Sequence, residues 1–223
     1  MTETTPRAII FDLDGTLYPM RWYMKPLMFA LLIRHGLRLP AYMAVRKVVA
    51  GKDFHTGDQL MAALCAELAK RMHGTPEAMR DWVERRFYPA FVRIMPALAG
   101  KRDSLPETLA RLRDRGVRLA VLSDFARVSE RLIGLGLQHS WFDIVASSEE
   151  AGALKPHPRP FLDIASRFSL HPAEILVIGD RDDTDGAAAT ACGMRFIRIS
   201  DKPSLPDSCL RWAAVRERLD VIS

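Results

Sequence analysis

The second half of the chain alternates short apolar strands with helices, and this rhythm constrains the fold more than any other feature. From Ser104 onward we predict strands over 117–122, 142–146, 175–178 and 195–199, separated by helices over 105–115, 126–135, 160–168 and 187–191. Residues 7–11 add one more buried strand near the N-terminus. Strands that alternate with helices in this way are typical of βαβ units and a parallel sheet. We therefore predict an α/β fold whose core is a Rossmann-like, doubly wound parallel sheet.

A long segment between the first strand and this alternating region has a helical pattern. Helices are predicted over 22–35, 40–50, 57–72 and 76–90. We expect residues 18–93 to form a small all-helical cap domain, and residues 1–17 and 94–223 to form the core. Apolar residues at helical spacing over 205–219 predict a further helix, which either packs on the core or forms a dimer surface. The sequence leaves the oligomeric state open.

The positive charge of the chain is concentrated in the predicted cap. The whole chain has 32 Lys and Arg against 27 Asp and Glu, and residues 18–93 alone hold 13 bases against 6 acids. Between Tyr18 and Lys52 there are seven bases and no acid. A local excess of this kind fits an anionic small substrate, a phospholipid surface or an acidic partner, whereas diffuse basic charge would have indicated nucleic acid.

Cysteine usage and hydropathy indicate a cytoplasmic protein. Cys65, Cys192 and Cys209 lie far apart with no CxxC pair, which argues against a disulfide framework and a structural zinc site. The N-terminus lacks the charged and apolar regions of a signal peptide. The apolar stretch from Leu27 to Ile33 is too short to span a bilayer, so we expect no transmembrane segment.

Polar residues follow the predicted strands at the points where these strands end. They are Asp12 and Asp14, Ser123 and Asp124, and Asp180 and Asp185. In open parallel sheets ligands bind outside the carboxyl ends of the strands. We therefore expect these side chains to meet in one site.

The residue types in this set suit phosphoryl transfer. Carboxylates at Asp12, Asp14 and Asp180 would repel one another unless a cation lies among them, and oxygen ligands suit Mg²⁺. The run from Asp180 to Asp185 holds four acids in six residues, which also favours metal binding. A carboxylate can attack phosphorus to form an aspartyl-phosphate, while a second carboxyl group protonates the leaving oxygen and later activates water.

Two further residues fit a phosphoryl site, although each alone has a simpler explanation. The Ser123 hydroxyl and the backbone N–H groups that follow it could hold a phosphoryl oxygen, but a serine there also suits a helix N-cap. Lys155 precedes a predicted helix and could neutralise a phosphoryl group, but a single lysine is usually a surface residue.

Taken in order, four motifs resemble those of the haloacid dehalogenase superfamily of phosphatases. They read FDLDGTL from Phe11, VLSD from Val121, KPHPRPF from Lys155, and VIGDRDDTDGAA from Val177. The resemblance covers residues 7–17 and about 104–199. Residues 18–93 match no motif of the superfamily, but their position after the first strand is similar to that of the small helical cap found in many members.

The resemblance implies a role for each motif residue. Asp12 would be the nucleophile and a Mg²⁺ ligand, and Asp14 the general acid and base with its backbone carbonyl on the metal. Ser123 would bind the phosphoryl group and Lys155 would stabilise it. Asp180 would be the third protein ligand of Mg²⁺. Asp185 would act as a ligand through water or support the lysine.

Substrate-binding positions are expected at Gly15, Thr16, Asp124 and Arg181. Thr16 would orient the substrate or the turn that carries Asp14. Asp124 stands where members often have Asn, and Arg181 stands where a small residue is common. Arg181 either pairs with Asp182 or Asp183 or reaches the substrate, and Asp183 has no assigned role.

The resemblance thus implies a Mg²⁺-dependent phosphatase that acts on a small phosphorylated metabolite. Asp14 argues against a metal-free dehalogenase and a Schiff-base phosphonate hydrolase, which lack an aspartate two residues after the nucleophile. A phosphosugar mutase shares the whole core and stays open, as does a basic cap that binds a membrane or a partner. Substrate specificity would lie in the cap, with candidates at residues 21–23 and 25, namely Arg21, Trp22, Tyr23 and Lys25.

Overall fold

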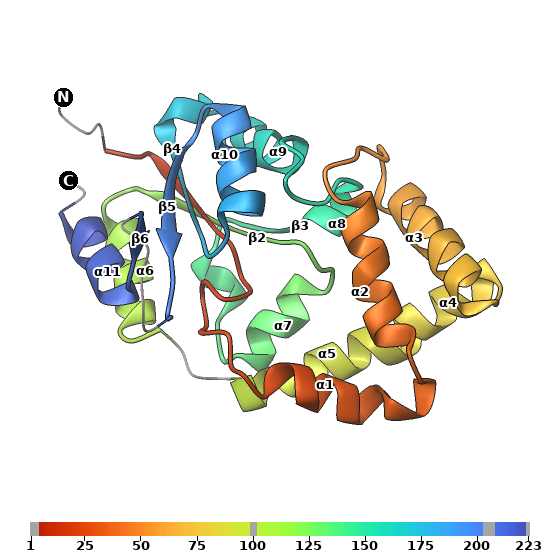
Figure 1. Cartoon of the computed structure of the whole chain (residues 1–223). Helices are drawn as coiled ribbons and strands as arrows, with labels where there is room; N and C mark the ends of the chain where they lie inside the picture. The colour runs from red at the N-terminus through yellow and green to blue at the C-terminus, as the bar shows by residue number, and fades with distance from the viewer. Residues whose placement is uncertain (1–4, 99–101, 203–207, 222–223) are drawn as a thin grey trace.

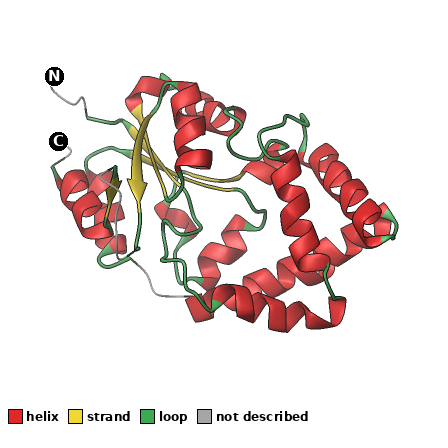
Figure 2. Cartoon of the chain, in the orientation of Figure 1, coloured by secondary structure: helices red, strands yellow, loops and turns green. Residues whose placement is uncertain are grey.

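The computed structural model describes residues 5–98, 102–202 and 208–221. Six strands form one sheet: β1 (Ala8–Phe11), β2 (Arg118–Ser123), β3 (Ile144–Ser147), β4 (Ile175–Gly179), β5 (Arg195–Ile199) and β6 (Cys209–Leu210). All five pairings are parallel and the strand order is β3-β2-β1-β4-β5-β6. The chain therefore builds the sheet outward from β1 in one direction and then returns to build it in the other. This order confirms the predicted doubly wound sheet, which Figure 2 shows in yellow.

Helices cover both faces of the sheet. They are α6 (Leu105–Asp114), α7 (Val128–Gly134), α8 (Ser148–Ala151), α9 (Arg159–Phe168), α10 (Ala187–Cys192) and α11 (Trp212–Asp220). Short helical turns occur at η4 (His139–Trp141), η5 (Pro172–Glu174) and η6 (Asp182–Gly186), the last a π-helical turn. The α/β rhythm read from the sequence is therefore correct to within a few residues for most elements.

The helix predicted over 205–219 is wrong in its first part. Cys209–Leu210 is the edge strand β6, and α11 begins only at Trp212. Residues 205–207 lie outside the described part of the chain. Leu210 is in a strand because its backbone pairs with Ile199 of β5. Pairing between residues distant in the chain cannot be predicted from the local spacing of apolar residues.

Alternation along β1 explains why this strand is apolar at every position. Ile9 and Phe11 belong to one buried cluster, which includes Leu109 of α6 and Leu132 of α7. Ala8 and Ile10 belong to a second cluster on the opposite face, with helix α9. A strand that is covered on both faces needs a continuous apolar run, as parallel strands in α/β proteins do.

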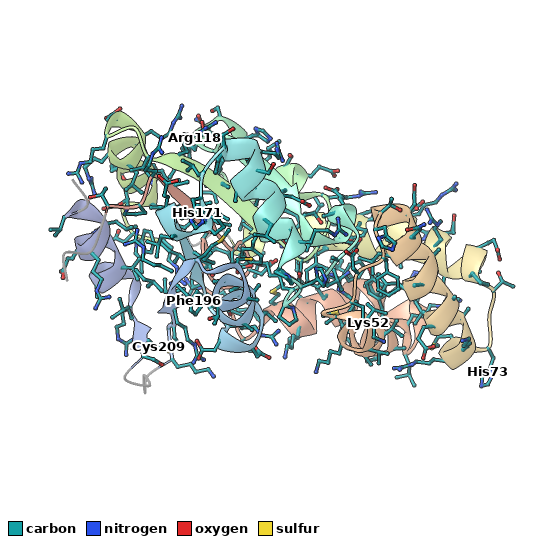
Figure 3. The ribbon with its side chains drawn as sticks, turned by 90° about the horizontal axis from the view of Figure 1, so that it is seen from above. Lys52, His73, Arg118, His171, Phe196 and Cys209 are labelled. Atoms are coloured by element: carbon teal, nitrogen blue, oxygen red, sulfur yellow. The ribbon has the colours of Figure 1, made fainter. Side chains whose placement is uncertain are left out.

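Residues 24–98 form the helical segment between β1 and α6. It comprises α1 (Met24–Leu32), η1 (Ile33–His35), α2 (Arg38–Val49), α3 (Gly57–Met72), α4 (Pro76–Trp82), η2 (Val83–Phe87), α5 (Tyr88–Ile94) and η3 (Met95–Leu98). In Figure 1 these helices occupy one end of the molecule. Figure 3 places Lys52 and His73 at that end and Arg118, His171, Phe196 and Cys209 at the sheet end.

The chemistry of the helix ends accounts for several boundaries in this segment. The hydroxyl groups of Thr56 and Thr75 accept the backbone N–H groups of Gln59 and Ala78, both at 3.2 Å, and so cap α3 and α4. The helix predicted over 76–90 continues to Ile94 instead of stopping. The π-helical turn η2 ends at Phe87, two residues before Pro89, whose missing N–H would interrupt a regular helix.

A buried ionic network ties the helical segment to the sheet core. Arg46 of α2 forms an ion pair with Glu149 of α8, and the Tyr88 hydroxyl donates to the same carboxylate. Arg46 Nη2 also donates to the backbone oxygen of Asp124 at 2.6 Å. Arg46 and Glu149 are both buried, so each charge depends on the other for compensation.

No helix in the described ranges combines the length and the hydropathy that a membrane span requires.

Replacement of Phe161 by Ala is expected to lower the free energy of unfolding by about 3–5 kcal/mol. Phe161 is fully buried in the cluster beneath α9, so truncation leaves a cavity. The next residue, Leu162, is 42% exposed, and Leu162→Ala is the matched control with an effect under about 1 kcal/mol. Urea denaturation followed by circular dichroism measures both. Equal losses in the two variants would contradict this account of the core.

Candidate active site

The candidate site lies where the winding of the sheet reverses, at the carboxyl ends of β1 and β4. Asp12 directly follows β1, and its backbone N–H donates to Ile178 of β4 at 2.9 Å. Asp180 directly follows β4. Adjacent parallel strands that end together bring the residues after them together, and such a switch point is where ligands bind in this architecture.

Three carboxylates converge at this point, and one lysine binds two of them. One oxygen each of Asp12, Asp180 and Asp185 lie within 4.8 Å of one another. Lys155 Nζ donates to Asp12 Oδ1 at 2.7 Å and to Asp185 Oδ1 at 2.7 Å. It also donates to the backbone oxygen of Leu122 at 2.8 Å. Lys155 is buried, so the side chain is part of the site and not a surface lysine.

The electrostatics of this cluster favour a cation. Burial raises the pKa of Asp12 well above its usual range, the charges of Asp185 and Asp180 add to this, and Lys155 opposes it. Burial and the Asp185 charge raise the pKa of Asp180 to about 6. Burial disfavours the charged form of Lys155, but Asp12 and Asp185 outweigh it and raise the lysine pKa. Three ionised carboxylates and one ammonium sum to −2, which a divalent cation with oxygen ligands would balance.

Two glycines leave room for the carboxylates of the site. Gly15 has a φ of +90°, and a Cβ at this position would lie 2.5 Å from Asp180 Oδ2. A Cβ on Gly179 would lie 2.5 Å from the Asp185 carboxyl carbon. Any side chain at either position would therefore displace a carboxylate of the cluster.

Asp14 lies beside this cluster but in a different environment. Its carboxylate forms an ion pair with Arg131 and accepts the Tyr18 hydroxyl at 2.5 Å and the Ser123 hydroxyl at 3.0 Å. Burial alone would raise the pKa of Asp14, but the charge of Arg131 and these hydrogen bonds lower it below its usual range. The two aspartates of the DLD sequence thus have pKa values shifted in opposite directions.

Arg131 is the site residue that the sequence analysis missed. It is fully buried on α7, and its Nη1 donates to Ser123 Oγ at 2.8 Å. A sequence signal for it exists, because Arg131 occupies the core position in the helical series Val128, Leu132 and Leu135. Its guanidinium carbon lies 4.2 Å from the ring centre of Phe91 on α5, so the helical segment also contributes to the site.

Three of the predicted substrate-binding residues lie against the residues of the site, and the fourth, Arg181, does not. The Thr16 hydroxyl donates to Asp12 Oδ2 at 3.0 Å, and the Asp124 carboxylate accepts the Lys155 backbone N–H at 3.0 Å. Gly15 is in contact range of Asp180. Arg181 is instead paired with Asp183 at 2.6 Å in an exposed ion pair, which is one of the arrangements left open by the sequence.

The remaining candidates lie outside the carboxylate cluster. The Tyr23 hydroxyl donates to the backbone oxygen of Ala97 at 2.9 Å, and Arg21, Trp22 and Lys25 are exposed. Asp182 pairs with Arg198 of β5. The acidic run 180–185 therefore contributes two acids to the cluster, while the other two are held by arginines.

A family model for haloacid dehalogenase-like hydrolases matches residues 6–193. The chain belongs to this family. It is 30% identical over 209 residues to a glyceraldehyde 3-phosphate phosphatase of Methanopyrus kandleri, with 86% of this chain and 83% of that protein covered. It is 27% identical over 197 residues to a phosphoglycolate phosphatase of Pectobacterium atrosepticum, with 86% and 80% covered.

A solved structure gives the same result for the fold. The magnesium-bound HAD-hydrolase YfnB of Bacillus subtilis aligns with a TM-score of 0.67 at 15% identity and covers 98% of this chain and all of that one, 100%. The resemblance stated from the four motifs and the predicted enzyme class, a phosphatase of this superfamily, are confirmed by the family match and the phosphatase relatives.

In metal-free protein, Asp180→Asn is expected to raise the free energy of unfolding at pH 7.5 by about 2 kcal/mol. The folded-state pKa of Asp180, about 6, exceeds its ordinary value of 3.8. The stability linked to this group is therefore full below 3.8 and is lost as the pH rises through 6. The asparagine removes that loss, so the gain should fall to about half at pH 5.0.

Urea denaturation in EDTA at the two pH values measures this difference. Asp183→Asn is the matched control, because Asp183 is an exposed acid of the same loop that is paired with Arg181. A variant at Asp180 that is less stable than wild type at both pH values would contradict the repulsion described here.

Proposed function

We propose that the chain is a Mg²⁺-dependent phosphatase that hydrolyses a small phosphorylated metabolite through an aspartyl-phosphate on Asp12. The observation that carries this proposal is the convergence of Asp12, Asp180 and Asp185 at the switch point of the sheet, where Lys155 pairs with Asp12 and Asp185. Asp14 and Ser123 lie beside them with Arg131.

Asp12 is assigned as the nucleophile. In the first step its carboxylate oxygen bonds to phosphorus while the bond from phosphorus to the ester oxygen breaks. Lys155 touches Asp12 Oδ1 and Thr16 touches Oδ2, so both oxygens are oriented before the substrate arrives. The lysine ammonium opposes the rise that burial causes in the pKa of Asp12, and it reduces the repulsion between this carboxylate and an incoming phosphate.

Asp14 is assigned as the general acid and base. It donates a proton to the leaving oxygen in the first step, and accepts one from water as that water attacks the aspartyl-phosphate in the second. Arg131 stabilises the ionised form, which is the form that accepts a proton. A phosphoryl group that enters beside Arg131 competes for the same positive charge, and this raises the proton affinity of Asp14 when the acid is needed.

Ser123 and Lys155 are assigned to the phosphoryl oxygens. Ser123 Oγ already contacts Asp14 and Arg131, and Lys155 Nζ contacts the nucleophile. Both donors are fixed by buried neighbours, so little reorganisation is needed as charge develops in the transition state.

The residues around Asp12 fit a Mg²⁺ ion. Asp12 and Asp180, with the backbone carbonyl of Asp14, would hold it, and Asp185 would act through water or through Lys155. When bound, the ion neutralises phosphoryl oxygens and the surplus negative charge of the cluster. The same charge arithmetic, three carboxylates against one lysine, supports a divalent rather than a monovalent ion.

The relatives narrow the class of substrate. Glyceraldehyde 3-phosphate and phosphoglycolate, named for the two curated relatives, are small anionic phosphomonoesters. We assign residues 18–93 to a cap domain that closes over the site, and the rest of the chain to the core. Contacts of Phe91 and Tyr88 with the arginine and glutamate network support this division. A cytoplasmic location fits the three cysteines, which are all free.

Phosphate release from a panel of phosphomonoesters tests the proposal. The panel holds glyceraldehyde 3-phosphate, phosphoglycolate, phosphoserine and hexose phosphates, each with Mg²⁺ and with EDTA. Asp12→Asn is expected to reduce Mg²⁺-dependent release at least about a thousandfold, because the nucleophile is lost. Asp182→Asn, which alters an acid outside the cluster, should retain the wild-type rate.

Turnover by Asp12→Asn at the wild-type rate would refute Asp12 as the nucleophile. Isomerisation of a hexose phosphate without phosphate release would assign the chain to the mutases of the superfamily instead.

Calorimetric titration tests the metal ligands separately from activity. Asp180→Ala is expected to weaken Mg²⁺ binding at least about tenfold, because one charged ligand is removed. Asp183→Ala changes an exposed acid of the same loop and should alter the affinity less than twofold. Unchanged affinity in Asp180→Ala would remove this residue from the ligand set.

A further inference from the structure

Exposed apolar side chains concentrate in one short part of the chain. Among the described residues, eight of the eleven large hydrophobic side chains that are exposed fall between positions 20 and 48. They are Met20, Trp22, Phe29, Leu31, Ile33, Leu37, Met43 and Val48. Single exposed apolar residues are ordinary, but a concentration of large ones marks an interaction surface.

Helix α1 and its flanks form the centre of this concentration. Met28 and Leu32 are buried and hold α1 against the rest of the molecule. Phe29 and Ile33 are exposed, and their four-residue spacing places them on one face of the helix. Trp22 precedes the helix and is 85% exposed, and Leu37 follows it and is 70% exposed. This apolar stripe of residues begins before α1 and ends after it, and α1 lies at the lower edge of the molecule in Figure 1.

Cations flank the stripe and no acid accompanies them. Arg21, Lys25 and Arg34, in and around α1, are exposed, as is Lys47 in the last turn of α2, and Arg38 at the start of α2 is half-buried. Within the described ranges none of these five forms an ion pair with a carboxylate. Arg46 differs, because it is buried and neutralised by Glu149. The surface around α1 thus carries uncompensated positive charge.

We propose that this surface docks on an anionic lipid bilayer. We call it the α1 face and define it by Trp22, Lys25, Phe29, Ile33, Arg34 and Leu37. Exposed aromatic and aliphatic side chains with flanking Lys and Arg are the combination that holds a helix in the plane of a membrane interface. The apolar groups enter the acyl boundary while the cations remain at the anionic headgroups.

The charge distribution argues against a second copy of the chain as the occupant. In a twofold dimer the same face meets itself, so the cations of one α1 face would lie against those of the other. The arrangement also favours a bilayer over a protein partner. The exposed apolar residues lie on and beside one helix at the edge of the molecule, and a bilayer requires no complementary shape.

The α1 face begins close to the candidate active site. The Tyr18 hydroxyl donates to Asp14, and only three residues separate Tyr18 from Trp22. Docking would therefore hold the loop that carries the DLD sequence near the membrane. This inference does not rest on the proposed function, because it concerns a surface outside the carboxylate cluster.

Trp22 provides a direct readout of docking. Trp82 and Trp212 are buried and Trp141 is half-buried, so Trp22 is the tryptophan with the largest exposure in the described chain. The probes are vesicles of phosphatidylcholine alone and vesicles with about one third phosphatidylglycerol. We expect a blue shift of tryptophan emission and co-sedimentation with the anionic vesicles only. Both should weaken as the salt concentration rises, because the headgroup attraction is screened.

Paired variants separate the α1 face from overall charge. Lys25→Glu with Arg34→Glu is expected to reduce partitioning onto anionic vesicles at least about tenfold. Arg167→Glu with Arg218→Glu makes the same change of net charge at exposed positions on α9 and α11, and should reduce it less than about twofold. Ile33→Ser should weaken binding, whereas Ile133→Ser, at a 68% exposed position on α7, should not. Circular dichroism confirms folding of each variant.

Four outcomes would overturn the proposal. The first is failure of the wild-type chain to bind anionic vesicles at low salt, and the second is equal binding to both vesicle types. Equal losses in the two charge-reversed pairs would assign binding to net charge alone. Retention on polyglutamate without vesicle binding would assign the α1 face to an acidic protein partner.

Discussion

The mutual repulsion of three clustered carboxylates, two of them buried, is the constraint on which the rest of this structure depends. Asp12, Asp180 and Asp185 can share one site only because the Lys155 ammonium lies between two of them. The sheet order brings these carboxylates together, because β1 and β4 are neighbours and end side by side. Glycine at position 15 allows the loops to approach, and the loop before α9 brings in the lysine. The fold is thus arranged around a charge imbalance that a divalent cation and a phosphate can use.

Two buried arginines extend this arrangement into the helical segment. Arg131 joins Asp14 to the ring of Phe91, and Arg46 joins Glu149 to the loop after β2. A buried guanidinium that loses its carboxylate is strongly destabilising, so both contacts fix how the helices sit on the sheet. The environment of Asp14 and the packing of the helical segment therefore depend on the same side chain, Arg131.

The α1 face follows a different logic from that of the site. In the site, opposite charges are paired and mostly buried, with a surplus of negative charge. On the α1 face, cations and large apolar groups are both exposed. The candidate site and the α1 face lie only a few residues apart in the chain, at Tyr18 and Trp22. Membrane docking and phosphate chemistry would therefore be linked through one loop.

The amino-acid sequence by itself determined the alternation of strands and helices, the polar strand ends and the four motifs of the family. These are local patterns of hydropathy and residue type, and the doubly wound sheet and the meeting of Asp12 with Asp180 follow from them. Only the tertiary structure decided that Cys209–Leu210 is a strand, that Arg181 turns to Asp183, and that Arg131 holds Asp14. Each of these depends on contacts between residues distant in the chain or on a choice among nearby charges, and neither is encoded in spacing along the sequence.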